Sequence, residues 1–528
     1  MRHKPKHGLA QPRFGPHAES VIVSYPPPLQ SLHCPYLYAP MFYSVAQLRQ
    51  IEHAAQAQGL PLMQRAGLAA ADFIRQRFGQ QAHVLILAGP GNNGGDALVA
   101  ARLLRELGYP VTVVLPSGPS KLPIDATLAY RDWRTSGGVE VHHLPASPYH
   151  VVIDGLFGIG LNRRLDSEWE TLINSVNGLG LPVLALDVPS GILADSGALP
   201  SVAIYARWTL SFIATARGLL TGAACNHVGE RQLATLGLSP DQLPNGELQA
   251  SQEIAQSVSL KRESDSHKGS FGSVLILGGA AGMAGASMLA GRAALHAGCG
   301  KVFVGQLDPH GPSIDLLRPE LMFRQLTVIK TVSQLSESAD VIVLGPGLGQ
   351  SDMAKNVVTQ ALQAPKPLLI DADALNLIAA DTDLAEQVRA RKSPTVLTPH
   401  PSEAARLLAC STATIQAQRF DAAQTLATRF HATVVLKGAG SLVADETQIA
   451  VNTGGSAAMA NVGQGDVLSG LIGALLAQGL NAWQAANLGV WAHGKASDQL
   501  VARTGGLVTL ADEVASEVGR VLSTHQHL

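Results

Sequence analysis

The segment His83-Val-Leu-Ile-Leu-Ala-Gly-Pro-Gly-Asn-Asn-Gly-Gly-Asp-Ala97 joins a short apolar run to a glycine-rich motif. The apolar run predicts a buried strand, and the glycines after it predict a tight turn into a helix. Glycine lets a backbone come close to a phosphate, and the first N–H groups of a helix attract anions. This order of elements is typical of a parallel α/β sheet.

A second motif of this kind, Asn461-Val-Gly-Gln-Gly-Asp-Val467, lies about 370 residues further along the chain. Each motif contains one aspartate, which is Asp96 in the first and Asp466 in the second. A carboxylate beside an anion site is unfavourable unless it takes a proton or holds a cation. The two motifs therefore predict two separate active sites.

Composition narrows the class of protein. The chain has 528 residues, of which 46% are hydrophobic, 5% aromatic and 15% charged. This length predicts two or three domains, and the composition is typical of α/β enzymes. A formal net charge of −2 gives no electrostatic argument for nucleic acid or an anionic membrane as partner. Chemistry on small molecules is therefore favoured.

Cysteine usage and the N-terminal segment bear on location. The four cysteines, Cys34, Cys225, Cys299 and Cys410, are scattered along the sequence. Their spacing suggests neither a zinc site nor a disulfide framework, so it favours a reduced, cytoplasmic location. No stretch reaches the ~20 apolar residues that a membrane span needs. Residues 1–40 are rich in proline and lack the apolar region of a secretory signal. We interpret them as a disordered tail or as the product of an upstream start codon, with Met41 as the natural beginning.

Short apolar runs predict a series of strands separated by helical segments, which is the pattern of a parallel sheet. The expected strands are 83–88, 111–115, 151–153, 183–186, 208–212, 272–279, 301–305, 340–344, 367–371, 395–398 and 433–436. Helices are expected at 44–57, with Ser44 as the cap, at 61–77 and at 284–297. We expect two dissimilar α/β domains, at 41–235 and 266–528, joined by a polar linker at 236–265.

The first motif, Gly89-x-Gly91-x-x-Gly94, also matches the dinucleotide fingerprint of nicotinamide dehydrogenases. That fold needs an acid at the end of the second strand, where this sequence has Leu115-Pro-Ser117. Later strands instead end at Asp154 and at Asp187. Carboxyl ends of parallel strands line the ligand crevice. Side chains at such ends would therefore converge on the first motif.

Three of these side chains would offer oxygen atoms at one place: Asn93, Asp154 and Ser190. A mixed set of neutral and anionic oxygens suits a weakly held hard cation and does not suit zinc.

Several segments of the first half resemble the NAD(P)HX epimerase family: Leu62-Met-Gln-Arg-Ala-Gly67, Asn92-Asn-Gly-Gly-Asp96, Asp154-Gly-Leu-Phe-Gly-Ile-Gly-Leu161 and Asp187-Val-Pro-Ser-Gly191. The similarity covers roughly residues 41–235 and implies a Rossmann-like domain. It implies that Asp187 is catalytic and that Asn93, Asp154 and Ser190 bind K⁺. It also implies that the hydrated dinucleotide contacts Asp187 and a further set of residues: Asn92, Asn93, Gly94, Gly95, Asp96, Gly158, Ile159, Gly160, Leu161, Asn162, Arg163 and Arg164. Ala97 departs from the family, where glycine is commoner.

In the second motif, Gly463-x-Gly465-Asp466 would stabilise a phosphoryl group on backbone N–H groups while Asp466 deprotonates the attacking hydroxyl. This pattern resembles the ribokinase-like α/β fold. Further segments narrow the resemblance, over roughly 250–520, to the ADP- or ATP-dependent NAD(P)H-hydrate dehydratases: His267-Lys-Gly269, Leu344–Gly349, Ile370–Asn376, Leu397–Glu403 and Val435–Ser441. The whole chain resembles the bacterial bifunctional NAD(P)H-hydrate repair enzymes.

The resemblance implies roles for residues of the second domain. Asp466 would be catalytic and would contact the hydrated cofactor together with Ala286, Gly349 and His400. The adenine nucleotide would contact Lys437, Gly438, Ala439, Gly440, Ser441 and Gly465. The sequence departs from the family at Ser402, where glycine is usual, and at Asn461, Val462 and Gln464, where the family has Thr-Gly and Thr. Because glutamine is bulkier than threonine, Gln464 is expected to alter the hydrogen bonding of the phosphate loop.

Each of these residues also has a purely structural interpretation. Asp154 and Asp187, taken singly, serve equally well as turn residues. A histidine such as His400, taken by itself, more often lies in a turn with its hydrogen bonds satisfied. Lys437, taken by itself, is interpreted as a solvated lysine. We favour function for His400 and Lys437 because each lies at a strand end. An alternative of a different functional class is that the first domain is a binding module without catalytic activity. The presence of both Asp154 and Asp187 argues against this alternative.

The expected function is metabolite repair. The resemblance implies that the first domain interconverts R- and S-NAD(P)HX, the hydrates of NADH and NADPH, with K⁺ bound. The second would restore S-NAD(P)HX to NAD(P)H with ADP, giving AMP and phosphate, with Mg²⁺ on the nucleotide. The competing interpretation is a small-alcohol kinase, for thiazole or pyridoxine, fused to a sensing domain. The sequence does not decide whether the nucleotide is ADP or ATP, although it favours ADP. It also does not decide whether NADHX or NADPHX is the preferred substrate. We expect a homo-oligomer.

Overall fold

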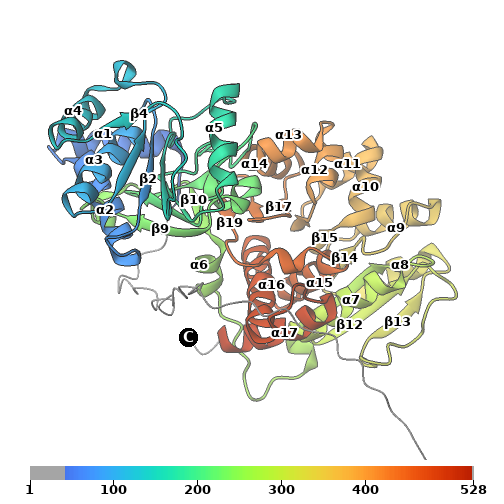
Figure 1. The fold of residues 1–528 in the computed structure, drawn as a ribbon. Helices are drawn as coiled ribbons and strands as arrows, with labels where there is room; N and C mark the ends of the chain where they lie inside the picture. The colour runs from blue at the N-terminus through green and yellow to red at the C-terminus, as the bar shows by residue number, and fades with distance from the viewer. Residues whose placement is uncertain (1–41, 526–528) are drawn as a thin grey trace, which may run out of the picture. The chain divides into compact units, whose positions relative to one another are not determined.

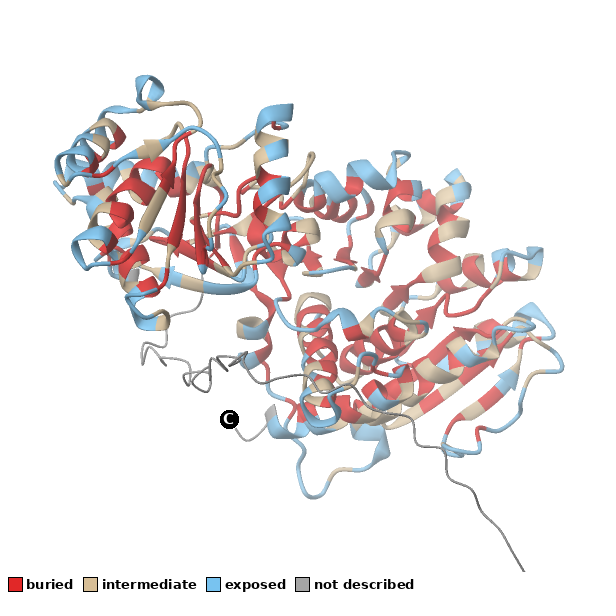
Figure 2. Cartoon of the chain, viewed as in Figure 1, coloured by how far each residue is buried: buried red, intermediate tan, exposed pale blue. Residues whose placement is uncertain are grey.

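The computed structural model describes residues 42–525, whose strands form two sheets (Figure 1). Our interpretation of residues 1–40 falls outside this described range. Parallel strands alternate with helices in both sheets, so the predicted α/β fold class is confirmed. In Figure 2 the central strands are buried, and most of the covering helices bury one side and expose the other.

The first sheet has the strand order β4-β3-β2-β5-β6-β7-β9, and every neighbouring pair is parallel. Its strands are β2 (Val84–Ala88), β3 (Val111–Val114), β4 (Glu140–Val141), β5 (Val151–Gly155), β6 (Val183–Leu186), β7 (Trp208–Phe212) and β9 (Glu230–Ala234). The five strands expected from apolar runs are all present. The edge strands β4 and β9 were not expected, because one has two residues and the other is largely polar.

Helices cover both faces of this sheet (Figure 1). They are α1 (Val45–Ala57), α2 (Leu62–Arg77), α3 (Asn92–Glu106), α4 (Ile124–Thr135) and α5 (Ser167–Gly178). Ile86 of β2 packs in one core cluster with residues of α1 to α4, whereas Leu87 packs in another with α5. The alternation follows from the two-residue period of a strand. Ser44 caps α1 as predicted, because its hydroxyl accepts the Gln47 N–H at 3.3 Å.

The second sheet is mixed, in the order β13-β12-β11-β14-β15-β16-β17-β18-β19-β10-β1-β8. Its strands are β1 (Phe42–Tyr43), β8 (Thr215–Ala216), β10 (Leu248–Ala250), β11 (Ser273–Gly278), β12 (Lys301–Gln306), β13 (Met322–Gln325), β14 (Val341–Leu344), β15 (Leu368–Ile370), β16 (Thr395–Leu397), β17 (Thr433–Leu436), β18 (Leu442–Ala444) and β19 (Ile449–Val451). The strands from β13 to β17 are parallel, and all six strands expected in this half are among them.

The helices of the second half are α6 (Ser251–Gln256), α7 (Ala284–His296), α8 (Ile329–Ser338), α9 (Asp352–Gln363), α10 (Ala372–Ala380), α11 (Thr382–Ala390), α12 (Pro401–Leu408), α13 (Thr412–Ala417), α14 (Arg419–Phe430), α15 (Gln464–Ala477), α16 (Ala482–Thr504) and α17 (Ala511–His525). Helices α8 to α14 share one core cluster with Leu275 of β11. Helices α6, α7 and α15 to α17 share another with Ile276. The sheet is therefore covered on both faces.

The two halves of the chain meet in the second sheet. The short strands β1 and β8 come from the first half, and β10 comes from the segment that we interpreted as a linker. Strand β10 pairs with β19 in parallel and with β1 in antiparallel orientation. The segment 236–265 is thus part of a sheet, and the described residues belong to a single compact unit.

Candidate active sites

The first glycine motif forms a turn between β2 and α3, as the sequence predicts. Its glycines allow two backbone segments to touch. A Cβ atom at Gly89 would lie 1.7 Å from the carbonyl oxygen of Leu156, and one at Gly94 would lie 2.0 Å from that of Gly89. Gly91 has no neighbour within 4 Å of such an atom. Of these three, only Gly91 leaves open space beside the backbone.

A cavity of about 1010 Å³ lies over this turn. It is lined by most of the residues that we expected to bind the hydrated dinucleotide: Asn92, Asn93, Asp96, Gly158, Ile159, Gly160, Leu161, Asn162, Arg163 and Asp187. Three expected residues do not line it. Gly94 and Gly95 are buried in α3, and Arg164 forms an ion pair with Glu170 at 3.2 Å. The expected substrate site is therefore largely assembled at one place.

Asn93, Asp154 and Ser190 lie where α3 meets the ends of β5 and β6; Asn93 lines the cavity, whereas Asp154 and Ser190 are buried beside it. The Ser190 hydroxyl donates to Asp154 Oδ1 at 2.7 Å, and the Ser190 N–H donates to Asp154 Oδ2 at 2.9 Å. Asn93 Nδ2 donates to the carbonyl oxygen of Leu186 at 3.2 Å, but Asn93 Oδ1 is buried with no partner among the described residues. A buried amide oxygen without a partner is unfavourable unless it binds something else.

Asp187 follows β6 in a left-handed backbone conformation, with φ of 64°. This conformation is uncommon for any residue except glycine and points to a functional constraint. The carboxylate accepts the Ile159 N–H at 2.8 Å, and a Cβ atom at Gly158 would lie 2.5 Å from Asp187 Oδ2. Burial raises the Asp187 pKa to about 6. Burial thus makes the Asp187 carboxylate a stronger base than an exposed aspartate.

Two further cavity residues, Arg49 and Glu52, come from α1 and were missed by the sequence analysis. Burial and the Asp187 carboxylate raise the pKa of Glu52 to about 7, against the opposing effect of Arg49. Burial, Asp187 and Glu52 also raise the pKa of Asp96 well above its usual value. Four carboxyl groups line this cavity, those of Glu52, Asp96, Asp125 and Asp187, and three of them act on one another. On sequence alone Glu52 looks like a solvated residue opposite the apolar stripe of α1.

The second site lies at the start of α15, where Gly463 has a positive φ of 85° and Asp466 occupies the first turn. Burial and the carboxylate of Asp371 raise the Asp466 pKa to about 7, and Lys437 opposes this shift. The ammonium of Lys437 binds Asp371 Oδ1 at 2.7 Å, and the Ser469 hydroxyl binds Asp371 Oδ2 at the same distance. A Cβ atom at Gly465 would lie 3.3 Å from Lys437 Nζ. Lys437 is therefore a partly buried residue of the anion site.

Burial alone would lower the pKa of Lys437, but the nearby carboxylates of Asp371, Glu403 and Asp466 outweigh burial and raise it. The ammonium accordingly stays charged beside the helix start. Asp371 was not among the residues that we expected in the site. It is almost fully buried at the end of β15 and is the first residue of the Asp-Ala-Asp segment that carried part of the resemblance.

His400 caps α12 at the end of β16. Its Nδ1 accepts the N–H groups of Ser402 and Glu403 at 3.1 and 3.3 Å, and its own N–H donates to Glu403 Oε2 at 2.7 Å. Burial, followed by the charge of Lys437, lowers the His400 pKa. The ring therefore has the structural role of a cap, and at the same time its half-exposed side chain remains accessible.

Ala286 lies in the first turn of α7, directly after one glycine loop, and Gly349 lies in a second glycine loop that contacts the first. The Ala280 N–H donates to the carbonyl oxygen of Gly347 at 2.7 Å, and a Cβ atom at Gly347 would lie 3.1 Å from that of Ala286. The Gly349 N–H donates to Asp373 Oδ2 at 2.8 Å. These loops thus place the two expected substrate contacts together, beside a carboxylate that also acts on Asp466.

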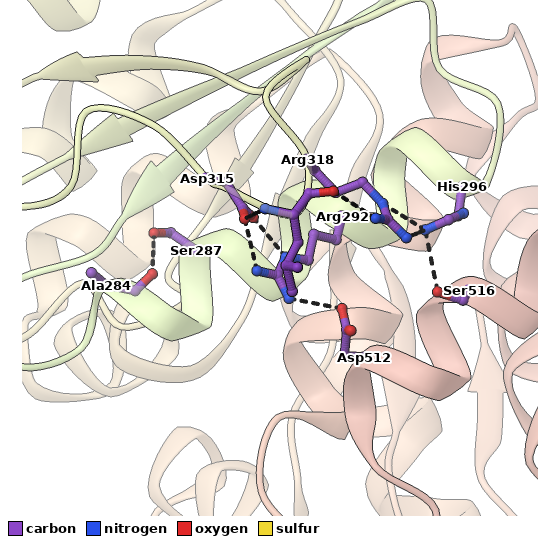
Figure 3. Close-up of polar contacts among 9 residues, drawn as sticks. Ala284, Ser287, Arg292, His296, Asp315, Arg318, Asp512 and Ser516 are labelled. Atoms are coloured by element: carbon purple, nitrogen blue, oxygen red, sulfur yellow. Dashed lines mark hydrogen bonds and ion pairs between the residues drawn. The ribbon is translucent and has the colours of Figure 1, made fainter.

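Helix α7, which carries Ala286, is anchored by charged side chains (Figure 3). Arg292 binds both carboxylate oxygens of the buried Asp315, at 2.6 and 2.8 Å, and Asp512 of α17 at 2.9 Å. One turn further on, His296 contacts Arg318 and Ser516. This network fixes the helix behind the expected substrate contact.

Gln464, which departs from the family pattern, forms hydrogen bonds within the protein through its side-chain amide. Its Nε2 donates to Asn461 Oδ1 at 3.2 Å and to the carbonyl oxygen of Thr509 at 2.8 Å. Its Oε1 lies 3.1 Å from Nε2 of the buried His493. The extra length of glutamine is therefore accommodated in the helix packing.

Comparisons with known proteins cover both halves. Residues 59–218 match the family model for the YjeF-related protein N-terminus, and residues 274–520 match the model for NAD(P)H-hydrate dehydratase. The bifunctional NAD(P)H-hydrate repair enzyme Nnr of Escherichia coli strain K12 is 41% identical over 481 residues, which are 89% of this chain and 91% of the relative. The protein of the same name from Coxiella burnetii is 38% identical over 490 residues, 90% and 98% of the two chains.

A solved structure is also similar. The ADP/ATP-dependent NAD(P)H-hydrate dehydratase of Bacillus subtilis, crystallised with ATP and Mg²⁺, is 28% identical and covers 52% of this chain and 97% of its own, with a TM-score of 0.47. Within residues 42–525, no helix combines the length and the apolar character that crossing a membrane requires.

Proposed function

This chain belongs to the family of bifunctional NAD(P)H-hydrate repair enzymes, and from that premise we propose how its residues share the two reactions. The enzyme is an epimerase that interconverts R- and S-NAD(P)HX and a dehydratase that returns S-NAD(P)HX to NAD(P)H. We place the epimerase in residues 41–235 and the dehydratase in residues 266–528. We also propose that it is a cytoplasmic homo-oligomer. Light scattering on the purified protein tests the oligomeric state.

In the epimerase half, Asp187 acts on the hydrated ring. Its carboxylate lies in the cavity formed by the expected substrate residues, and burial brings its pKa to about 6. A general acid or base works best when its pKa is near the working pH. Asn92, Asn93, Asp96 and residues 158–163 would surround the dinucleotide. Gly94, Gly95 and Arg164 do not line the cavity, so we propose that they act only by shaping the loops.

The oxygen set of Asn93, Asp154 and Ser190 fits K⁺. Asn93 Oδ1 lacks a partner among the described residues, and it lies in the site together with a fully buried carboxylate whose pKa burial raises to about 6. A bound monovalent cation would supply the missing partner and favour the ionised form of Asp154. K⁺ would thereby hold the loop that carries Phe157 and Gly158.

In the dehydratase half, Asp466 takes the proton of the 6-hydroxyl group. The freed oxygen attacks the terminal phosphorus of ADP, and the bond from that phosphorus to the oxygen of AMP breaks. Phosphate then leaves C6 as C5 loses a proton, which restores the C5–C6 double bond. The N–H groups at the start of α15 and the ammonium of Lys437 stabilise the charge of the moving phosphoryl group. Mg²⁺ carried by the nucleotide would neutralise its remaining phosphate charge.

The observation that carries the dehydratase mechanism is the environment of Asp466. The carboxylate lies in the first turn of a helix, its pKa is raised to about 7, and the ammonium of Lys437 lies against the neighbouring Gly465. This arrangement combines a base with an anion site, which the removal of a poor leaving group requires. Ala286, Gly349 and His400 would contact the hydrated ring, and residues 437–441 would contact the nucleotide.

The test is incubation of the protein with a mixture of NADHX epimers, Mg²⁺ and either ADP or ATP. We expect the absorbance of reduced nicotinamide to return, with AMP formed from ADP. A parallel incubation with thiazole and pyridoxine alcohols tests the kinase alternative. Phosphorylation of a vitamin alcohol without recovery of NADH would contradict the proposal. The same assay with NADPHX and with both nucleotides determines the preferred substrates.

A further inference from the structure

The proposed nucleotide loop, residues 437–441, is in contact with the epimerase half of the chain. It connects β17 to β18 and meets the segment between the short helices η2 (Arg217–Leu220) and η3 (Gly222–Asn226). The Thr221 hydroxyl lies 2.7 Å from the carbonyl oxygen of Gly440 and 3.1 Å from that of Ala439. The Gly222 N–H also donates to the carbonyl oxygen of Ala439, at 3.0 Å.

The loop and the segment around Thr221 are packed closely against one another. A Cβ atom at Gly440 would lie 1.8 Å from the carbonyl oxygen of Leu220, so the two backbones touch directly. Gly440 has a φ of 59°, a conformation that glycine adopts without strain. The loop is thus shaped against the surface of the epimerase half.

Arg419 completes the contact from the other side. Its Nε donates to Thr221 Oγ1 at 2.8 Å, and its Nη2 donates to the carbonyl oxygens of Leu436 and Lys437 at 3.2 Å. Both Arg419 and Thr221 are completely buried. Because Thr221 Oγ1 accepts from Arg419, its hydrogen is directed to the loop. Burial lowers the Arg419 pKa to about 10, so the group remains charged at neutral pH.

The consequence concerns the other polar groups of the loop. The carbonyl oxygens of Lys437, Ala439 and Gly440 are all engaged by Arg419, Thr221 or Gly222. Within residues 42–525, no acceptor is assigned to the N–H groups of residues 438–440. Successive free N–H groups form a concave site for an anion. A buried arginine without a carboxylate partner in the same range adds positive potential.

We propose that Thr221 is a positioning residue for nucleotide use in the dehydratase half. Its hydroxyl, oriented by Arg419, holds the carbonyl oxygens of the loop so that the N–H groups of residues 438–440 stay available to the nucleotide phosphates. The inference rests on the proposed nucleotide role of this loop. It makes the affinity for ADP depend on a residue that lies outside the dehydratase domain.

The test compares Thr221→Val, which keeps the shape but removes the hydroxyl, with Thr221→Ser, which keeps the hydroxyl. Initial rates of S-NADHX dehydration are measured against ADP and against S-NADHX. For Thr221→Val we expect the KM for ADP to rise about tenfold, which corresponds to the loss of one or two buried hydrogen bonds. The kcat, the KM for S-NADHX and the epimerisation rate should change by less than about twofold. Thr221→Ser should keep the wild-type KM for ADP.

The outcomes separate this inference from the proposed function. If the wild type dehydrates S-NADHX with ADP and Thr221→Val has an unchanged KM for ADP, only the role of Thr221 is wrong. If Thr221→Val and Thr221→Ser both lower kcat and raise the KM for ADP and for S-NADHX together, Thr221 has a merely structural role and the inference is overturned. If Thr221→Val does not fold, Thr221→Ala is measured in its place. If the wild type neither binds nor uses a nucleotide, the proposed function is wrong, and this inference, which depends on it, is wrong as well.

Discussion

At the scale of single residues, Asp466 and Asp187 are the two carboxyl groups that we propose as catalytic, and their surroundings differ. Each is a carboxyl group held near neutral pKa by burial, but Asp466 is also opposed by Lys437, whereas Asp187 accepts one backbone N–H. A carboxylate with an ordinary pKa would be a weak base at neutral pH. Burial therefore supplies the basicity, and the neighbouring groups keep a useful fraction of each carboxyl ionised.

Asp466→Asn gives the first prediction. The change keeps the shape and removes the base, so dehydration of S-NADHX should fall by about 10²–10⁴-fold, the usual effect of a positioned general base. Epimerisation, measured separately by chromatography of the two epimers, should be unchanged. A loss of both activities would show that Asp466 supports the fold.

The pH profile tests the same residue in the wild type. A base is active in its deprotonated form, so a pKa of about 7 means that dehydration should slow as the pH falls below this value. The residual activity of Asp466→Asn should lack this dependence. A wild-type rate that is constant down to the ordinary range of aspartate would contradict the raised pKa.

Several residues could be predicted from the sequence because motif and strand end coincide. Asp154 and Asp187 each follow a predicted strand, and Asp466 belongs to the second glycine motif. Glu52 could not be identified in this way, because a glutamate on the polar side of an amphipathic helix looks the same whether it faces solvent or a cavity. The same holds for Thr221, whose role depends on a contact with a loop more than 200 residues away.

At the scale of elements, long apolar strands were predictable and short ones were not. Strands β2, β6, β11 and β14 are marked by four or more apolar residues in succession. Strands β1, β8 and β10 have two or three residues each, and pairing across the chain makes them strands. Local sequence contains no signal for such pairing, so the extension of the second sheet into the first half was not foreseen.

The convergence of α3, β5 and β6 on Asn93, Asp154 and Ser190 leads to the prediction on potassium. Replacing K⁺ by tetramethylammonium should slow epimerisation more than dehydration, because a larger cation does not fit the three oxygen atoms. Rates of both reactions in the two salts at equal ionic strength provide the measurement. Equal sensitivity of the two reactions would refute the assignment of the ion to this site.

Helix α7 gives a prediction on stability. In Arg292→Met the buried Asp315 loses its bidentate partner, and such a loss usually destabilises a protein by about 3–5 kcal/mol. Burial opposes ionisation of Asp315, but Arg292 outweighs it and lowers the pKa. The pair therefore contributes fully above the ordinary pKa of aspartate, and its contribution is lost as the pH falls through the lowered pKa.

Calorimetry at neutral pH should show a lower melting temperature for Arg292→Met, with a smaller difference in acid. The exposed pair of Lys261 and Glu263 offers a matched control, because Lys261→Met breaks an ion pair of 2.9 Å between two exposed side chains. That variant should melt close to the wild type. A similar shift in both variants would mean that burial of Asp315 is not the cause.

At the scale of the whole molecule, the two sites lie at the ends of different sheets and use different carboxylates. The cavity that we propose for the epimerase is lined by residues 49–236, whereas the charged groups that act on Asp466 come from residues 371–437. The halves share strands and the contact at Thr221, but no residue belongs to both sites. The two activities should therefore be separable, and R-NADHX should reach the dehydratase as S-NADHX released into solution.

Asp187→Asn tests this separation. With both epimers and excess ADP, the variant should show a fast phase equal to the S fraction, followed by a slow phase limited by spontaneous epimerisation. A single fast phase to completion would show that Asp187 is not the epimerase residue. Adding Asp466→Asn protein, which keeps its epimerase site, should convert the slow phase into a fast one. A slow phase that persists in the mixture would contradict the transfer of S-NADHX through solution.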